Sequence, residues 1–285
     1  MGTGTPVIGI AEMIIISVIS GTLAGILVTV VGVLVSIVCY RKFWDLDMVG
    51  APAVTTLGDI VTLPFLVMTA LLVTALPFAG KAVLGCIVLA MLLWAVISFK
   101  RGTRTMMDVL REGLPLLLPL SLLGITAGVL YTNQLDALIS AAAVLILISP
   151  FMNGCGSIGG ILTSRIGTEM HMGMIDPVLF PQKTVLKHFG ENYIYAVIFL
   201  PLMGAISHYA ALLLGITTPG LLLMVLLSLA AGLLVVTAMN LLGYYTAVIT
   251  YRRGFDPDNF GVPVVTSSID LIGATCLLAV MMLLL

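Results

Sequence analysis

The sequence predicts an all-α, polytopic membrane protein with about eight transmembrane helices. Of the 285 residues, 60% are hydrophobic and only 9% are charged, and the mean hydropathy is +1.22. A soluble domain could not bury this much apolar surface, so the lipid bilayer must solvate the chain. The formal net charge of −1 argues against a basic surface for nucleic acid, and we expect no nucleic-acid partner.

Eight apolar segments are long enough to cross a bilayer, which needs about 20 residues. They cover residues 10–39, 54–77, 79–99, 113–132, 135–161, 193–214, 220–249 and 263–285. The longest of them exceed one crossing, so we expect tilt, kinks or interfacial turns there.

The positions of the basic residues predict how these segments are oriented. With eight crossings, 11 of the 12 Lys and Arg residues fall on one side of the membrane, and only Lys81 falls on the other. The positive-inside rule makes the first side cytoplasmic. We therefore expect a multi-pass protein of the cell membrane with both termini outside.

Two stretches of the chain, 211 residues apart, have nearly the same sequence. Residues 40–62 and 251–273 are identical at nine of 23 positions. Upstream of them, Gly21 matches Gly232 and Gly32 matches Gly243 at the same offset. The chain therefore contains a predicted internal repeat.

Each copy of this repeat carries an aspartate inside an apolar segment, preceded by a proline and a threonine. The sets are Pro52, Thr55 and Asp59 in the first copy and Pro263, Thr266 and Asp270 in the second. If each proline lies in the first turn of a helix, each aspartate lies about 10 Å along that helix. Residues four apart share a helix face, so each copy presents a polar stripe that must face protein or water.

A repeated carboxylate inside a membrane protein indicates a cation path. Mg²⁺ takes hard oxygen ligands and retains much of its water, so one or two carboxylates suffice to bind it. We predict Asp59 and Asp270 as paired ligands, with Thr55 and Thr266 beside them. The alternative is an aspartate held neutral, or capped by a neighbouring hydroxyl, without a transport role.

A second pair of aspartates, Asp45 and Asp256, precedes these helices at the predicted cytoplasmic mouth. They either concentrate cations there or are ordinary turn residues. The predicted transported substrate is Mg²⁺, and we expect no organic cofactor.

The second copy resembles the MgtE magnesium-channel family and its two-repeat eukaryotic solute-carrier relatives. The matching motif is Asp256-Pro257, Pro263, Thr266-Ser267 and Asp270. The resemblance implies that Asp270 is the central pore ligand, and the repeat extends this role to Asp59. The first copy departs from the family in having Leu46 where the family has proline.

A glycine-rich stretch from Pro150 to Gly160 resembles the break in the second membrane helix of that family. Ser157-Ile158 stands where the family has Gly-Asn, so the role of that asparagine is not transferred to Asn153. The residues themselves favour either a broken helix that lines a cavity or close helix packing through Gly156 and Gly160.

The resemblance implies one complete five-helix unit at 105–285 and a partial unit at 1–77 that contains only the last two helices. A linker helix at 78–104 would restore a parallel orientation, giving a pseudo-two-fold axis perpendicular to the membrane. A second subunit, a homodimer partner or a truncated start would each account for the three helices absent from the first unit.

The predicted function is therefore transport of divalent cations, without enzymatic activity. An H⁺- or Na⁺-coupled carrier that uses the same aspartates is the main alternative. An intramembrane aspartyl protease also needs two aspartates, but the chain lacks a Gly-x-Gly-Asp motif. A non-transporting membrane subunit is the remaining alternative.

Two groups of polar residues are expected to have no transport role. Glu169, His171, Asp176 and His188 fall in a predicted loop at 166–192 and do not match a known metal-ligand spacing. His208, in the sixth segment, is expected to be packed and hydrogen-bonded.

Overall fold

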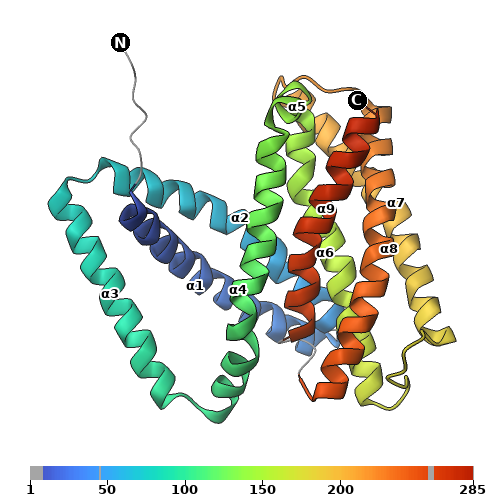
Figure 1. The fold of residues 1–285 in the computed structure, drawn as a ribbon, viewed down its shortest axis with the longest axis horizontal. Coiled ribbons are helices and arrows are strands. Elements are labelled where there is room, and N and C mark those ends of the chain that lie inside the picture. Colours follow the sequence, from blue (N-terminus) through green and yellow to red (C-terminus); the bar gives the residue numbers. More distant parts are fainter. Residues whose placement is uncertain (1–8, 45, 256–259, 285) are drawn as a thin grey trace. The chain divides into compact units, whose positions relative to one another are not determined.

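The computed structural model describes residues 9–44, 46–255 and 260–284, most of which are helical (Figure 1). The chain divides into two compact units, Met1–Met107 and Asp108–Leu285. Each unit has its own apolar cluster of packed side chains.

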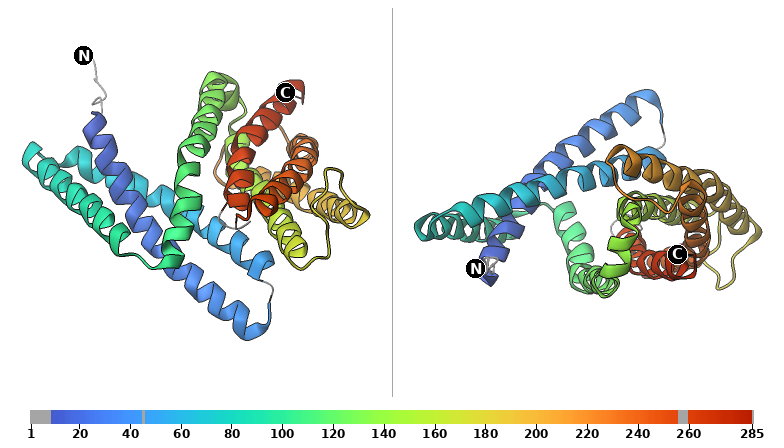
Figure 2. Two further views of the ribbon diagram at one scale, coloured as in Figure 1. Left: turned by 60° about the horizontal axis from the view of Figure 1, so that its bottom comes forward. Right: turned by 90° about the horizontal axis from the view of Figure 1, so that it is seen from above.

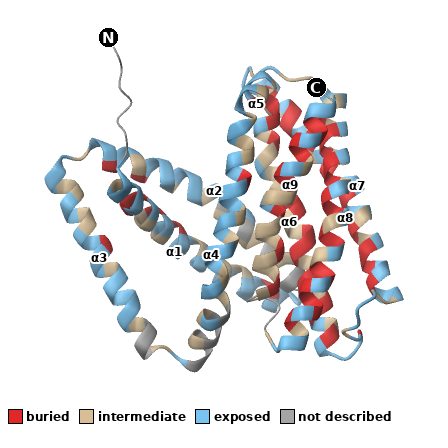
Figure 3. Cartoon of the chain, in the orientation of Figure 1, coloured by how far each residue is buried: buried red, intermediate tan, exposed pale blue. Residues whose placement is uncertain are grey.

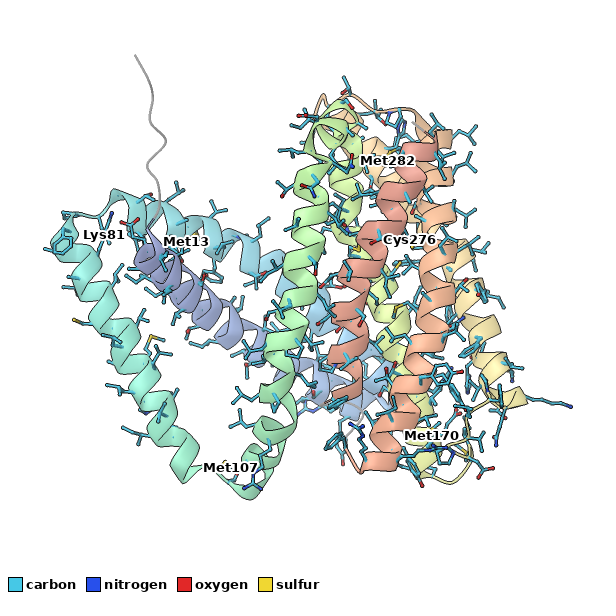
Figure 4. All side chains as sticks on the ribbon, viewed as in Figure 1. Met13, Lys81, Met107, Met170, Cys276 and Met282 are labelled. Atoms are coloured by element: carbon cyan, nitrogen blue, oxygen red, sulfur yellow. The ribbon has the colours of Figure 1, made fainter. Side chains whose placement is uncertain are left out.

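Unit 1 contains α1 (Ile10–Lys42), α2 (Leu46–Ala75) and α3 (Phe78–Arg101). A small apolar cluster of Ile15, Ile16, Val73 and Val88 joins the three helices. At the same end of the unit, Lys81 Nζ lies 2.6 Å from Glu12 Oε1, and Figure 4 labels Lys81 and Met13 there.

Unit 2 contains most of α4 (Arg104–Asn133) together with α5 (Leu135–Ser140), α6 (Ala142–His171), α7 (Lys183–Leu213), α8 (Leu221–Arg253) and α9 (Val262–Leu284). Helices α6 to α9 pack into a bundle, seen from above in Figure 2. Its core includes the fully buried side chains of Phe151, Leu200 and Met239. Figure 3 shows the buried residues concentrated in these four helices, whereas α1 to α4 are mostly exposed.

Within the described residues, eight helices are long and apolar enough to cross a membrane, all of them except α5. This confirms the predicted all-α, multi-pass class. In a bilayer such helices satisfy their backbone hydrogen bonds internally, and their exposed apolar faces suit contact with lipid.

The boundaries of the fifth and sixth crossings differ from the prediction. The segment predicted at 135–161 divides into α5 and α6, and α6 continues to His171. Helix α7 begins at Lys183, ten residues before the predicted start. The predicted loop at 166–192 is therefore too long. The connection covers only residues 172–182, because both helices extend through polar turns that hydropathy does not mark as helical.

The two repeat prolines also lie in different settings. Pro263 is the second residue of α9, as predicted for the first turn. Pro52 lies inside α2, which begins six residues earlier at Leu46, so its predicted place in a first turn is wrong. Asp59 therefore follows the start of its helix by 13 residues, or about 20 Å at 1.5 Å per residue.

Candidate cation site

Asp270 lies on the exposed side of α9, in a helix that is otherwise largely apolar. Its neighbour Ile269 and the preceding Val265 are buried in the core. Thr266, one turn before Asp270, is half-buried, and its Oγ1 donates to the carbonyls of Val262 (2.9 Å) and Pro263 (3.2 Å). The hydroxyl oxygen keeps its lone pairs, so Thr266 can still accept a hydrogen bond from ion-bound water.

The glycine-rich stretch of α6 fixes the orientation of α9. A Cβ atom at Gly156 would lie 3.9 Å from Ile269 Cδ1, and one at Gly160 would lie 3.6 Å from Val262 Cγ1. A Cβ at Gly159 would lie 3.0 Å from Val265 Cγ1 and closer still to a methionine methyl. Helix α6 is continuous through this stretch. Of the two alternatives that the sequence left open, the broken helix is therefore wrong and close packing is confirmed.

The other predicted ligands are not all covered by the structure. Thr55 and Asp59 belong to α2, but their side chains lie outside the described part of the chain. Asp45 and Asp256 are outside the described residues altogether. Among the residues that are described, no group of three or more His, Cys, Asp and Glu side chains could hold a metal ion. The pairing of Asp59 with Asp270 remains a prediction.

A polar network that the sequence analysis missed joins the ends of α6 and α7. His188 Nε2 lies 2.9 Å from Glu169 Oε2, and His188 Nδ1 lies 3.3 Å from Glu191 Oε2. Arg165 Nη1 lies 3.1 Å from the same Glu191 oxygen. The two carboxylates face different ring nitrogens, so the arrangement is a hydrogen-bonded network and not a chelating site. The three-residue spacing of His188 and Glu191 is the one feature of the sequence that indicates this hydrogen-bonded network.

Three further polar residues named in the sequence analysis have structural partners. Asp176 accepts a hydrogen bond from Gln182 at 3.0 Å, and His171 packs edge-on against Tyr251 with ring centroids 5.0 Å apart. His208 is buried and lies 2.9 Å from Thr218 Oγ1, which confirms its packed, hydrogen-bonded role.

Comparison with known proteins finds a family that is similar to the region around Asp270. Residues 148–280 match MgtE, described as a divalent cation transporter. The chain is also 27% identical over 262 residues to mouse "Solute carrier family 41 member 3", an alignment that covers 83% of this chain. It spans about half (51%) of the length of that relative. No solved structure matches the chain. Residues 148–280, which include α7, α8 and the aspartate of α9, are thus similar to the MgtE family of divalent cation transporters.

Proposed function

We propose that this chain moves divalent cations across a membrane and that Asp270 is one of its ion ligands. The observation that carries the proposal is the exposed carboxylate of Asp270 on a membrane-spanning helix, inside the region that matches the transporter family. A charge near the bilayer centre costs about 2.5–3.5 kcal/mol on insertion scales. Contact with water and a cation would offset that cost, and Mg²⁺ suits an oxygen site with retained water.

The second ligand would come from the internal repeat. Helices α1 and α8 are both 33 residues long, and their first and last residues are each 211 positions apart. Both end at a left-handed residue, Phe43 (φ 56°) after α1 and Gly254 (φ 69°) after α8. This correspondence supports a partial unit at 1–77, a linker helix at 78–104 and a complete unit at 105–285.

Two parallel units would bring the aspartates of α2 and α9 to a common axis perpendicular to the membrane. Asp59 and Asp270 would then share one hydrated cation, while Thr55 and Thr266 hold its water. Asp45 and Asp256 would lie at the cytoplasmic mouth, where they attract cations or form turns. The distribution of basic residues supports a cell-membrane location with both termini outside.

The test is Mg²⁺ flux into proteoliposomes that contain the full chain. We expect Asp270→Asn or Asp59→Asn to reduce flux at least about tenfold, because 1.4 kcal/mol of lost ion binding corresponds to that factor. The double variant should fall to the level of protein-free liposomes. Asp136→Asn, which removes an exposed carboxylate from α5, is the control and should keep full flux. Unchanged flux in the double variant would refute the site.

The same assay separates a channel from a coupled carrier. A channel passes Mg²⁺ down its own gradient at a rate that does not depend on an imposed Na⁺ or H⁺ gradient. Accumulation of Mg²⁺ against its gradient, driven by Na⁺ or H⁺, would establish the carrier. The match of residues 148–280 to a transporter family argues against the aspartyl protease alternative.

A further inference from the structure

We propose that the connection between α6 and α7 binds the headgroup region of an anionic lipid leaflet, through three exposed apolar residues and two lysines. The apolar residues, here termed the apolar triplet, are Val178, Leu179 and Phe180, and the lysines are Lys183 and Lys187. The connection joins two candidate membrane-spanning helices, at the lower end of the bundle in Figure 1. It therefore lies at the edge of any bilayer that both helices cross.

The apolar triplet is exposed although residues close to it are packed. Leu179 and Phe180 are 63% and 78% exposed. Ile175, in the same connection, is buried in a cluster with Met170 and Tyr244. Large apolar side chains that a fold leaves together on its surface mark a contact with a membrane or with another protein. The triplet is therefore a candidate contact surface.

The backbone of the triplet is bound to α8. Tyr244 Oη donates to the carbonyl of Val178 at 2.8 Å and lies 3.3 Å from that of Phe180. Arg252 Nη2 donates to the carbonyl of Pro177 at 2.6 Å. One proline precedes the triplet and another follows it, which restricts the backbone on both sides. The carbonyls thus bond to the bundle while the side chains remain exposed, so their exposure is a fixed feature of the fold.

The two lysines continue this surface along α7. By helical spacing, Lys183 and Lys187 share one side of α7 with Ile194 and Ile198, and all four side chains are exposed. Ile194 and Ile198 belong to a candidate membrane span, so we expect this side of α7 to face lipid. The lysines therefore lie on the lipid-facing side of the helix, at the end where it leaves the bilayer.

The charges around the lysines favour an anionic partner. Among the residues that the structure describes, neither lysine forms an ion pair. Two nearby carboxylates have other partners, since Asp176 accepts a hydrogen bond from Gln182, and Glu191 faces Arg165 and His188. Basic residues beside a transmembrane helix attract anionic lipids. A lysine stem can lie along apolar groups while its ammonium group reaches the headgroups.

A lipid leaflet fits this surface better than a soluble partner. The triplet and the lysines are adjacent, and the same side of α7 leads directly into residues that we expect to face lipid. The basic residues also predict that this connection is cytoplasmic, on the side where the leaflet is anionic. Inorganic phosphate would engage the lysines but leave the apolar triplet in water.

The experiment measures which lipid surrounds the apolar triplet. Trp44 and Trp94 are replaced by phenylalanine, and Phe180→Trp then supplies the one tryptophan of the chain. The full chain is reconstituted in phosphatidylcholine vesicles that contain an equal fraction of either brominated phosphatidylserine or brominated phosphatidylcholine. Bromine quenches tryptophan fluorescence on contact. We expect both lipids to quench, and the local preference for phosphatidylserine to be about fivefold for each lysine, the factor that corresponds to the attraction of one basic residue to an anionic leaflet.

Three further variants serve as controls and as the test of the lysines. Leu214→Trp in the same background reports on the connection between α7 and α8, which contains no Lys or Arg, and the two lipids should quench it equally. With tryptophan at position 180, Lys183→Gln combined with Lys187→Gln should abolish the preference for phosphatidylserine. Arg111→Gln, which removes an exposed basic residue from α4, should leave the preference unchanged.

Three results would each overturn the proposal. Absence of quenching at position 180 by either lipid would place the triplet in water. Equal quenching by the two lipids would show that the surface does not select anionic headgroups, and a preference that survives the loss of both lysines would show that they do not bind them. Both leaflets contain the brominated lipid, so the orientation of the chain does not affect the result. No ion flux is measured, so the result is also independent of the test of Asp59 and Asp270.

Discussion

Two sets of charged side chains in unit 2 differ in their exposure and in their contacts. The carboxylate of Asp270 lies on the exposed side of α9. Glu169, His188 and Glu191 instead form contacts of 2.9 and 3.3 Å with one another across the ends of α6 and α7. The exposed position of Asp270 agrees with the proposed contact with an ion, whereas the histidine network joins two helices.

Replacement of His188 tests the second set. Hydrogen bonds to charged groups contribute about 1.5–3 kcal/mol each, and His188 is only 9% exposed. We expect His188→Ala to lower the free energy of unfolding by about 2–3 kcal/mol, measured by denaturation in detergent. The control Lys187→Ala removes an exposed neighbouring charge and should change stability by less than about 0.5 kcal/mol.

A double-mutant cycle distinguishes the network from simple loss of packing. If His188 acts through Glu169, then Glu169→Gln and His188→Ala should be non-additive, because residues in direct contact couple. Fully additive effects would contradict the network. The sequence did not predict this contact, because the two residues are 19 positions apart and hydropathy carries no information about such pairing.

The aspartate on α9 could be predicted from sequence for a specific reason. A carboxylate in an apolar segment is costly, so its presence there twice, with the same neighbours, indicated a site. The residues around it were harder to predict. The glycines at 156, 159 and 160 are compatible with either a broken or a closely packed α6. Only the positions of α9 side chains next to them distinguish these alternatives.

At the scale of elements, α7 approaches the backbone of α8 closely at one glycine. A Cβ atom at Gly204 would lie 2.5 Å from the carbonyl oxygen of Met224. Hydrogen bonds also join the two helices. Tyr193 Oη lies 2.8 Å from Thr237 Oγ1, and Ser228 and Asn240 form further hydrogen bonds to α7. The interface therefore depends on a small residue at one point and on hydrogen bonds along its length.

Gly204→Ala tests this contact. The added methyl group meets backbone, which cannot rotate away, so we expect a loss of about 1–3 kcal/mol, as for other overpacked sites. Gly190→Ala is the matched control on the same helix, since a Cβ atom there meets nothing within 4 Å. That change should be neutral or stabilise α7 by about 0.5–1 kcal/mol. Equal unfolding midpoints for the two variants would contradict the close approach of α7 and α8.

The helices themselves were more predictable than their ends. Membrane-spanning helices are predictable because lipid requires long apolar segments, and this accounts for the eight candidate spans. Helix ends follow other rules. The last turns of α6, which ends at His171, and the first turns of α7, which begins at Lys183, are polar. Side chains of the two helices pair with each other there. Pro52 was expected to begin a helix, but α2 starts at Leu46, so a proline position alone did not locate the helix start.

At the scale of the whole molecule, the eight candidate spans and the basic residues together predict a topology. Arg165, Lys183 and Lys187 lie beside the connection between α6 and α7. The connection between α7 and α8, at residues 214–220, contains no Lys or Arg. The positive-inside rule therefore predicts that these two connections lie on opposite sides, the first of them cytoplasmic.

Cysteine labelling tests this topology with a matched pair of sites. Met172 and Leu214 lie in the two connections and are 60% and 69% exposed. Each is replaced by cysteine in a chain whose native Cys39, Cys86, Cys155 and Cys276 are changed to alanine. A membrane-impermeant maleimide added to intact cells should label Leu214→Cys but not Met172→Cys, and permeabilisation should expose both. The reverse pattern would invert the predicted orientation. Labelling of both sites in intact cells would show that α7 does not cross the membrane, which would remove the basis for a parallel arrangement of α2 and α9.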